Sequence, residues 1–346
     1  MDVHAAPRFV RPALSRVGLE GVETVVRLGV DQPSAQPFAA RIDCLVEPER
    51  GRPAAGVPRF DDVVADVVRQ VVVGAPGMRA ERLVREVAER VRERLQAPRA
   101  EVAIAARFPE RRPAPVSGTP TQEISTLHAR AVATRQGTRR MVGVSAQGVT
   151  ASPYAQGVFV ARARERLAAG GFSEARIARV LAGNARARLA ARGFSEDQIA
   201  QVLDRVPVAT HDQRGTGTLH VGCPEDCELA FDVPALLAIV EGAMSSEIFE
   251  LMKRSDEGAV VERAHRRPRA ADECVRAMIS GAVDHLAGLP DTVFVSAAQE
   301  NFETVHRHCI TAARAGLLGD LRRELAGGAA PARRMTIGEW LEAGGR

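Results

Sequence analysis

Closely spaced histidines are the first residues of this sequence that could do chemistry. His306 and His308 are separated by one residue, so both imidazoles lie on one face if the segment is a strand. A catalytic metal site needs three or four ligands and an open position for water. Most isolated pairs of this kind are ordinary surface or core histidines. His211 is a third candidate, because the chain has only eight histidines and three of them fall in polar segments.

Four polar segments interrupt otherwise apolar sequence, and they are residues 148–156, 209–215, 253–257 and 296–309. The third contains Lys253, the only lysine among 47 basic residues. Retention of one compact, flexible ammonium group favours a role such as phosphate binding. Chance retention is an equally good explanation.

The bulk composition sets limits on the class of protein. A chain of 346 residues forms one large domain or two of about 150–170 residues. Only 4% of the residues are aromatic, so the core must consist mainly of Val, Leu, Ile and Ala. No apolar run approaches the roughly 20 residues that cross a bilayer, and residues 1–14 lack the apolar region of a secretory signal. We expect a cytoplasmic protein without a membrane partner.

Charge and cysteine usage are less informative. The net charge of +4 comes from an arginine-rich composition typical of GC-rich coding, so we expect no nucleic-acid partner. Five scattered cysteines do not form a disulfide framework, and we expect reduced, mostly buried thiols. Cys223 and Cys227 have no second pair, which argues against a structural zinc site.

The first half of the chain shows the order strand, helix, helix, strands. Residues 38–46 alternate in polarity as a strand does, whereas 60–73 and 78–95 have apolar residues at helical spacing. Residues 101–108 and 124–149 are again strand-like.

The second half repeats this order. Residues 206–221 are extended, Asp232 caps a helix at 233–244, a second helix covers 271–289, and 292–310 is strand-like. Two similar modules in tandem predict an α+β protein.

We divide the chain into four parts. A poorly ordered or loosely docked lead-in covers 1–34, the first module 35–149, a linker with a helical insertion 150–205, and the second module with a C-terminal tail 206–346. The insertion is an internal duplication of a helical hairpin, with copies at 163–181 and 185–203. It is either a lid or subunit contact, or a tolerated surface expansion.

The four polar segments together resemble the type IB GTP cyclohydrolases, in their archaeal-like branch. The matching runs occur in family order over residues 140–310, and they are GVTASPYAQ, THDQRG, SSEIFELMKRSDE and QENFETVHRH. The resemblance implies the tunnelling fold, with two strand-strand-helix-helix-strand-strand modules, and a homotetramer with sites between subunits. It also implies one divalent metal per subunit, Fe²⁺ first, with Zn²⁺ or Mn²⁺ as alternatives.

The implied activity is the metal-dependent hydrolytic opening of the guanine imidazole ring of GTP, with release of formate. The product is a dihydroneopterin phosphate for pterin or folate-type biosynthesis, a 2′,3′-cyclic phosphate in the archaeal branch. The implied partners are GTP, water and further copies of the chain. Two alternatives remain open: an enzyme of the same fold with a shifted purine or pterin substrate, and a non-catalytic nucleotide-binding homologue.

The resemblance also assigns site residues. His211, Glu257 and His306 are the expected metal ligands, and His306, His308 and Glu257 are the expected catalytic groups. Ser152 joins the catalytic set because it occupies the position of a ligand cysteine in the family.

Substrate-binding residues follow from the same motifs. Gln299 and Glu300 are expected to contact the base, and Lys253 to contact phosphate. A carboxylate anchors the guanine N1–H and 2-amino group because it accepts both hydrogen bonds. Asp272 falls at that position, with Glu273 as its neighbour.

Several site motifs depart from the family pattern. Ser152-Pro153-Tyr154 replaces Cys-Pro-Cys, and a neutral hydroxyl is a poorer ligand than a thiolate. Asp272 is one methylene shorter than the usual Glu, Asp212 replaces an Asn, and residues 56–60 lack a family His, Met and Ser. Loss of activity therefore remains a possible outcome of these changes.

Overall fold

The computed structural model describes residues 14–29, 35–48, 60–73, 77–171, 195, 210–224, 232–329, 331 and 335–342. Most of the duplicated hairpin, predicted at 163–181 and 185–203, lies outside the described residues, and so does Cys227. Among the helices that are described, none has the length and apolar character needed to cross a membrane.

Divided by its repeat, the first module ends at residue 134, whereas the prediction also placed residues 138–149 in it. Its described residues form four strands and two helices, with a short π-helical turn after the first helix. These elements are β1 (Val17–Leu28), β2 (Gln36–Glu47), α1 (Phe60–Val68), η1 (Arg69–Val73), α2 (Ala80–Leu95), β3 (Arg99–Pro113) and β4 (Pro120–Thr134). The prediction of a poorly ordered or loosely docked lead-in is wrong for β1, because this segment pairs with β2 along nearly its whole length.

The second module repeats the pattern with additional helices. Its elements are β5 (Thr138–Ala151), α3 (Pro153–Ala169), β6 (Asp212–Cys223), α7 (Val233–Ala243), β7 (Ser246–Glu247), α8 (Arg254–Arg266), α9 (Ala271–His285), β8 (Phe294–Phe302), β9 (Cys309–Leu317), α10 (Leu318–Leu325) and α11 (Ile337–Glu342). The predicted cap of α7 is confirmed, since the Asp232 carboxylate accepts a hydrogen bond from the Ala235 amide at 3.3 Å.

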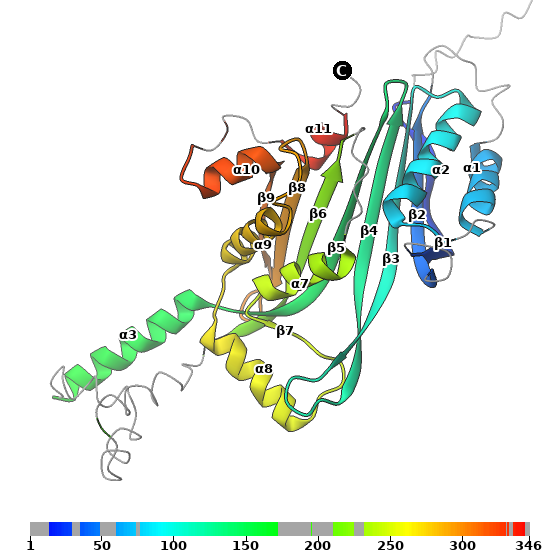
Figure 1. The fold of residues 1–346 in the computed structure, drawn as a ribbon. Helices are drawn as coiled ribbons and strands as arrows, with labels where there is room; N and C mark the ends of the chain where they lie inside the picture. The colour runs from blue at the N-terminus through cyan, green and yellow to red at the C-terminus, as the bar shows by residue number, and fades with distance from the viewer. Residues whose placement is uncertain are drawn as a thin grey trace, which may run out of the picture.

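One antiparallel sheet joins both modules in the order β1-β2-β3-β4-β5-β6-β8-β9, and β7 pairs with β5. Helices α1 and α2 lie beside one half of the sheet, and α7 and α9 lie beside the other half (Figure 1). The expected α+β architecture with two strand-strand-helix-helix-strand-strand modules is therefore confirmed.

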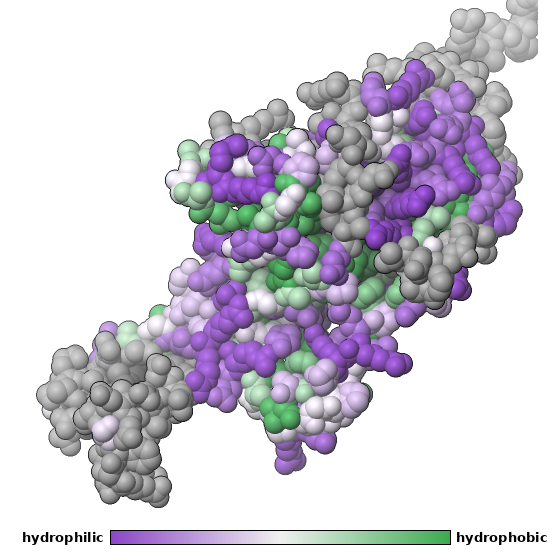
Figure 2. Space-filling model, in the orientation of Figure 1, coloured by the Kyte–Doolittle hydropathy of each residue, from purple (hydrophilic) through white to green (hydrophobic). Residues whose placement is uncertain are grey.

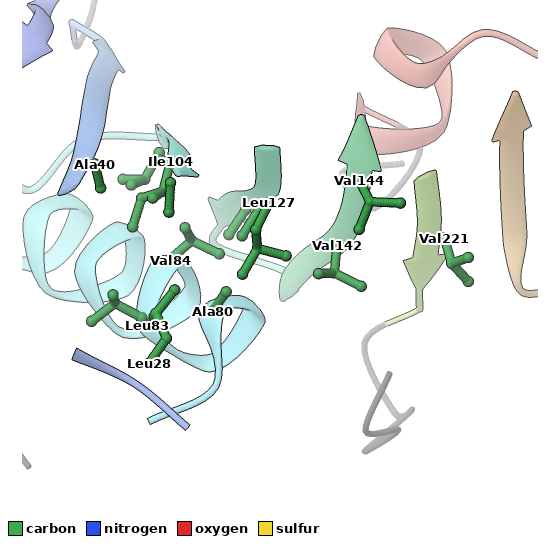
Figure 3. Close-up of a cluster of buried hydrophobic side chains, with 14 of the residues drawn as sticks. Leu28, Ala40, Ala80, Leu83, Val84, Ile104, Leu127, Val142, Val144 and Val221 are labelled. Atoms are coloured by element: carbon green, nitrogen blue, oxygen red, sulfur yellow. The ribbon is translucent and has the colours of Figure 1, made fainter. Parts of the chain in front are cut away.

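The core lies between the sheet and the helices. Leu83, Val84, Val87 and Val91 of α2 recur at helical spacing and are all buried. Figure 3 shows Leu83 and Val84 near β-strand side chains such as Leu127. Burying each such side chain contributes about 1.5–3 kcal/mol, so apolar contact with the sheet is enough to hold α2 in place.

Three boundaries differ from the sequence predictions. Residues 124–149 form two strands, because a turn at Gly137 reverses the chain between β4 and β5. The strand predicted at 292–310 ends at Phe302, and bends at residues 304–308 lead into β9. The helix predicted at 271–289 ends at His285.

The expectation that the cysteines are reduced is only partly correct. Cys44, Cys274 and Cys309 are free, but Cys223 at the end of β6 is disulfide-bonded. Its partner lies outside the described residues. Burial raises the pKa of the Cys44 and Cys274 thiols to about 12, so these two behave as inert core residues.

The β3–β4 hairpin extends beyond the rest of the sheet. Pairing of β2 with β3 stops at Ala106, and pairing of β4 with β5 starts at Thr126, whereas β3 and β4 pair as far as Pro113 and Pro120. We call residues 107–125 the hairpin arm. Its tip lies beside the N-terminal end of α8 (Figure 1).

Candidate active site

The candidate site forms where the ends of β5, β6 and β8 meet. Ala151 at the end of β5 pairs with Asp212 at the start of β6, and Gly215 of β6 pairs with Asn301 of β8. The antiparallel register therefore brings residues that follow β5, precede β6 and follow β8 to one edge of the sheet. Three of the four polar segments found in the sequence meet there.

Ser152 lies at this edge but its side chain has a structural task. Its amide donates to the carbonyl oxygen of His211 at 3.1 Å, and its own carbonyl accepts from the Thr210 hydroxyl at 2.9 Å. Its hydroxyl oxygen accepts from the Ala155 amide at 3.2 Å, which caps the start of α3. The predicted neighbourhood of Ser152 and His211 is thus present, with Ser152 acting as a helix cap.

His211 faces a buried carboxylate, Glu303. The distance from His211 Nε2 to Glu303 Oε2 is 3.5 Å, and only 4% of the Glu303 side chain is exposed. The other oxygen, Oε1, accepts a hydrogen bond from Gln213 Nε2 at 3.1 Å. Glu303 is absent from the site predicted from the sequence, although its carboxylate lies in the same polar run as His306.

Two buried oxygen atoms near this pair have no hydrogen-bond partner among the described residues. They are Thr150 Oγ1 and Gln213 Oε1, and the two residues pair across β5 and β6. Unpaired buried acceptors are costly, so they favour a bound donor such as water. The imidazole and carboxylate donors suit Fe²⁺, Zn²⁺ or Mn²⁺. They supply part of a ligand set, because the described residues contain no group of three or more His, Cys, Asp or Glu that could hold a metal.

His306 and His308 lie in the connection between β8 and β9. Both are exposed, and their rings stack with centroids 4.8 Å apart at 14°. The two rings lie on one side, as predicted. The strand on which that prediction depended does not form, because residues 304–308 are bends. The Thr304 hydroxyl donates to the Asp212 carbonyl at 3.1 Å and fastens this connection to β6.

The predicted ligand Glu257 and the predicted phosphate contact Lys253 lie at the N-terminal end of α8, and both are exposed. At the other end of this helix, His265 Nε2 lies 3.0 Å from the Thr210 carbonyl oxygen. The length of α8 therefore separates Glu257 from His211. Within one chain the structure does not bring His211, Glu257 and His306 into a common metal group.

Gln299 and Glu300 point to opposite faces of β8. Gln299 is 1% exposed and donates to Asn301 Oδ1 at 3.0 Å on the side that faces the helices. Gly215 makes room for it, because a Cβ there would lie 2.4 Å from Gln299 Nε2. Glu300 is exposed on the opposite face. Only Glu300 is open to a ligand in a single chain.

The two candidate guanine anchors also differ. Glu273 accepts a hydrogen bond from the Ala270 amide at 2.8 Å and so holds the start of α9. Asp272 is exposed and pairs with Arg276 one turn later at 2.7 Å. Exposed pairs of this kind contribute little, so Asp272 is the carboxylate that a ligand can recruit.

The site therefore combines an imidazole–carboxylate pair at a sheet edge with an exposed pair of histidines, a donor set typical of hydrolytic enzymes. A family model described as type I GTP cyclohydrolase folE2 matches residues 1–312. The chain belongs to this family.

Relatives with the printed name GTP cyclohydrolase MptA match nearly the whole chain. The protein from Methanosarcina mazei is 29% identical over 332 residues, covering 94% of this chain and 96% of its own. The protein from Methanoregula boonei is 32% identical over 333 residues, covering 94% of each.

Among solved structures, a uricase from Bacillus fastidious covers 94% of this chain and 100% of its own, with 11% identity and a TM-score of 0.47. Uricase from Arthrobacter globiformis covers 89% and 95%, with 10% identity and a TM-score of 0.44. Both scores are below 0.5, so the fold described above stands on its own strand order.

Proposed function

We propose that the protein is a GTP cyclohydrolase that opens the imidazole ring of guanine in GTP, releases formate and yields a dihydroneopterin phosphate for pterin biosynthesis. The observation that carries this proposal is the contact between His211 and Glu303. It joins two motifs that lie about 90 residues apart in the chain, and both belong to the set on which the family resemblance rests.

The chain's own groups have distinct tasks in this proposal. Glu303 orients His211, since a carboxylate beside an imidazole selects which ring nitrogen carries the proton. Gln213 holds the other Glu303 oxygen, so the carboxylate keeps one orientation. His306 and His308, exposed at the same sheet edge, exchange protons with the substrate and with water. Asp272, Glu300 and Lys253 are proposed contacts to guanine, base edge and phosphate.

A divalent metal, Fe²⁺ first, is the proposed cofactor, with His211 as its ligand and Glu303, His306 and Glu257 as candidates to complete the set. Such an ion lowers the pKa of a bound water toward neutrality and so supplies hydroxide. Because one chain offers only part of the ligand set, we propose that a homotetramer completes the site with residues from a neighbouring copy.

The test is incubation of the anaerobic, Fe²⁺-loaded protein with GTP, followed by assays for formate and for a fluorescent pterin after oxidation. We expect both products in the wild type and neither in Glu303→Gln, which keeps the size of the side chain but removes its charge. Absence of formate from the loaded wild type would end the proposal.

A second candidate function is nucleotide binding without catalysis. The observation that favours it is the capping role of Ser152, because this position then offers no free ligand. Metal analysis separates the two: the enzyme binds about one ion per chain with its three or four ligands, and the non-catalytic homologue binds far less.

A further inference from the structure

The segment between β7 and α8 is fastened along the hairpin arm. Arg112 of the arm donates to Glu241 Oε2 at 2.6 Å and to the Ile248 carbonyl at 2.8 Å. Its guanidinium also lies over the Phe249 ring, 4.7 Å from the centroid. The first contact point is thus a side chain of the first module holding the start of the SSEIFELMKRSDE run.

Glu123 provides a second contact point. This side chain is buried, and its two oxygens accept from the Glu250 amide at 3.0 and 3.2 Å. The Thr121 hydroxyl donates to the same carboxylate at 2.8 Å. The middle of the run is therefore bound to the β4 side of the arm.

Asp256 provides the third and most complete contact. It is fully buried and accepts four hydrogen bonds, from the amides of Val116 and Ser117 at 2.9 and 2.7 Å, the Ser117 hydroxyl at 2.7 Å and the Lys253 amide at 2.9 Å. Burial alone would raise its pKa, but the hydrogen bonds from Ser117, Lys253 and Val116 hold that pKa far below its usual range. Asp256 is therefore a buried anion joining the tip of the arm to the first turn of α8.

Two residues of this turn, Lys253 and Glu257, have side chains that could take part in the reaction. Lys253 and Glu257 are both exposed, and the Glu257 amide donates to the Lys253 carbonyl at 3.0 Å. The Asp256 carboxylate fixes the Lys253 backbone directly and the Glu257 backbone through this turn. Figure 2 shows hydrophilic residues near α8 on the face in view.

We propose that Asp256, held by Ser117 at the tip of the hairpin arm, is a positioning residue that sets the orientation of Lys253 and Glu257 for the reaction. The inference rests on the proposed function and adds to it that the first module supports groups supplied by the second. Arg112 and Glu123 already hold the segment at two points. The contact of Asp256 with the hairpin arm is the one that fixes the turn carrying Lys253 and Glu257.

The chain offers a direct probe of this turn, because Lys253 is its only lysine. A lysine-specific endoproteinase therefore has a single cleavage site, between Lys253 and Arg254. We expect slow cleavage of the wild type and cleavage at least about tenfold faster in Asp256→Asn and Ser117→Ala, because loss of a hydrogen bond to a charged group raises the local opening equilibrium by about this factor. Unchanged cleavage in both variants would show that Asp256 does not hold the turn.

Activity then separates positioning from a merely structural role. We expect Asp256→Asn to lower kcat/KM for GTP at least about tenfold when it is introduced into the wild-type protein. Introduced into the Glu257→Gln variant, it should have little further effect, because the effects of coupled residues are not additive. Additive losses would overturn the proposal. The matched control is Glu123→Gln, the other buried carboxylate on this segment, which we expect to lower thermal stability while leaving kcat/KM near the wild-type value.

The outcome for the proposed function stays distinguishable. If the loaded wild type releases no formate, the enzyme proposal fails, and the affinity for GTP measured by calorimetry replaces kcat/KM. Weaker GTP binding in Asp256→Asn and Lys253→Met, with no further loss in the double variant, then supports the positioning role. Equal binding in all of these proteins contradicts it.

Discussion

Two pairs of histidines occupy contrasting places in this molecule. His306 and His308 stack in the exposed connection after β8, with ring centroids 4.8 Å apart. His128 of β4 and His220 of β6 lie on the face of the sheet opposite α7 and α9, with ring centroids 5.5 Å apart. Gly143 of β5 lies between them in register and leaves the space through which the rings approach.

Burial separates the behaviour of the two pairs. Burial lowers the pKa of both His128 and His220, and the nearby His128 and Arg130 help to bring that of His220 to about 4. His128 Nε2 also lies 2.8 Å from the Ser145 hydroxyl. The half-buried pair, which we call the interior pair, is therefore neutral and structural, whereas the exposed pair is open to solvent and ligands. The contrast predicts that one pair controls turnover and the other controls stability.

The largest effect is expected for His306→Ala, measured as formate release from GTP by the Fe²⁺-loaded enzyme. Turnover should fall by at least about 100-fold, the usual contribution of a general acid or base. The midpoint of thermal unfolding should not change, because the side chain is exposed. His220→Gln is the matched variant and should keep its turnover while losing stability. Wild-type turnover in His306→Ala would break the comparison.

The second effect is a pH dependence of stability that belongs to the interior pair. The folded pKa of His220, about 4, lies below the ordinary value of 6.5, so between these values the unfolded chain binds the extra proton. The contribution of His220 to the unfolding free energy is then complete above pH 6.5, decreases as the pH falls toward 4 and changes no further below it. The largest possible loss of unfolding free energy from this group is about 3 kcal/mol, at 1.36 kcal/mol per pKa unit.

Denaturant titrations between pH 4 and 7 measure this dependence. His220→Gln should show a shallower decrease in unfolding free energy than the wild type. His285→Gln, at an exposed position of α9, is the control and should follow the wild-type curve. Parallel curves for all three proteins would remove the titration of His220 as the cause.

The same contrast shows what the sequence could predict. Polarity patterns located most elements, because apolar side chains at helical or alternating spacing must face a core. The spacing of His306 and His308 was visible because they are near neighbours. The sequence does not reveal the pair of His128 and His220 or the contact of His211 with Glu303. Strand register brings these residues together from distant parts of the chain.

The third effect concerns the space between the interior rings. In Gly143→Ala the new Cβ would lie 2.3 Å from His220 Cδ2 and 2.7 Å from the Leu219 carbonyl oxygen. Overpacking of this kind costs about 1–3 kcal/mol of unfolding free energy. Gly242→Ala in α7 is the control, since nothing lies within 4 Å of its added Cβ, and it should stabilise the protein by about 0.5–1 kcal/mol. Equal stability of the two variants would show that the rings move apart without cost.

The smallest effect on stability, and the sharpest test of the exposed edge, comes from Ser152. Replacing it with Cys weakens the cap of α3 and should cost about 0.5–1 kcal/mol. The new thiolate should bind Zn²⁺ more tightly than the hydroxyl does, because it is a charged, soft ligand beside His211. Ser152→Ala loses the same cap without gaining a ligand, so it isolates the metal effect in competition titrations with a chelator. If Cys and Ala give equal Zn²⁺ affinity, position 152 does not face the metal, and the chemistry of this edge belongs to the histidines and Glu303.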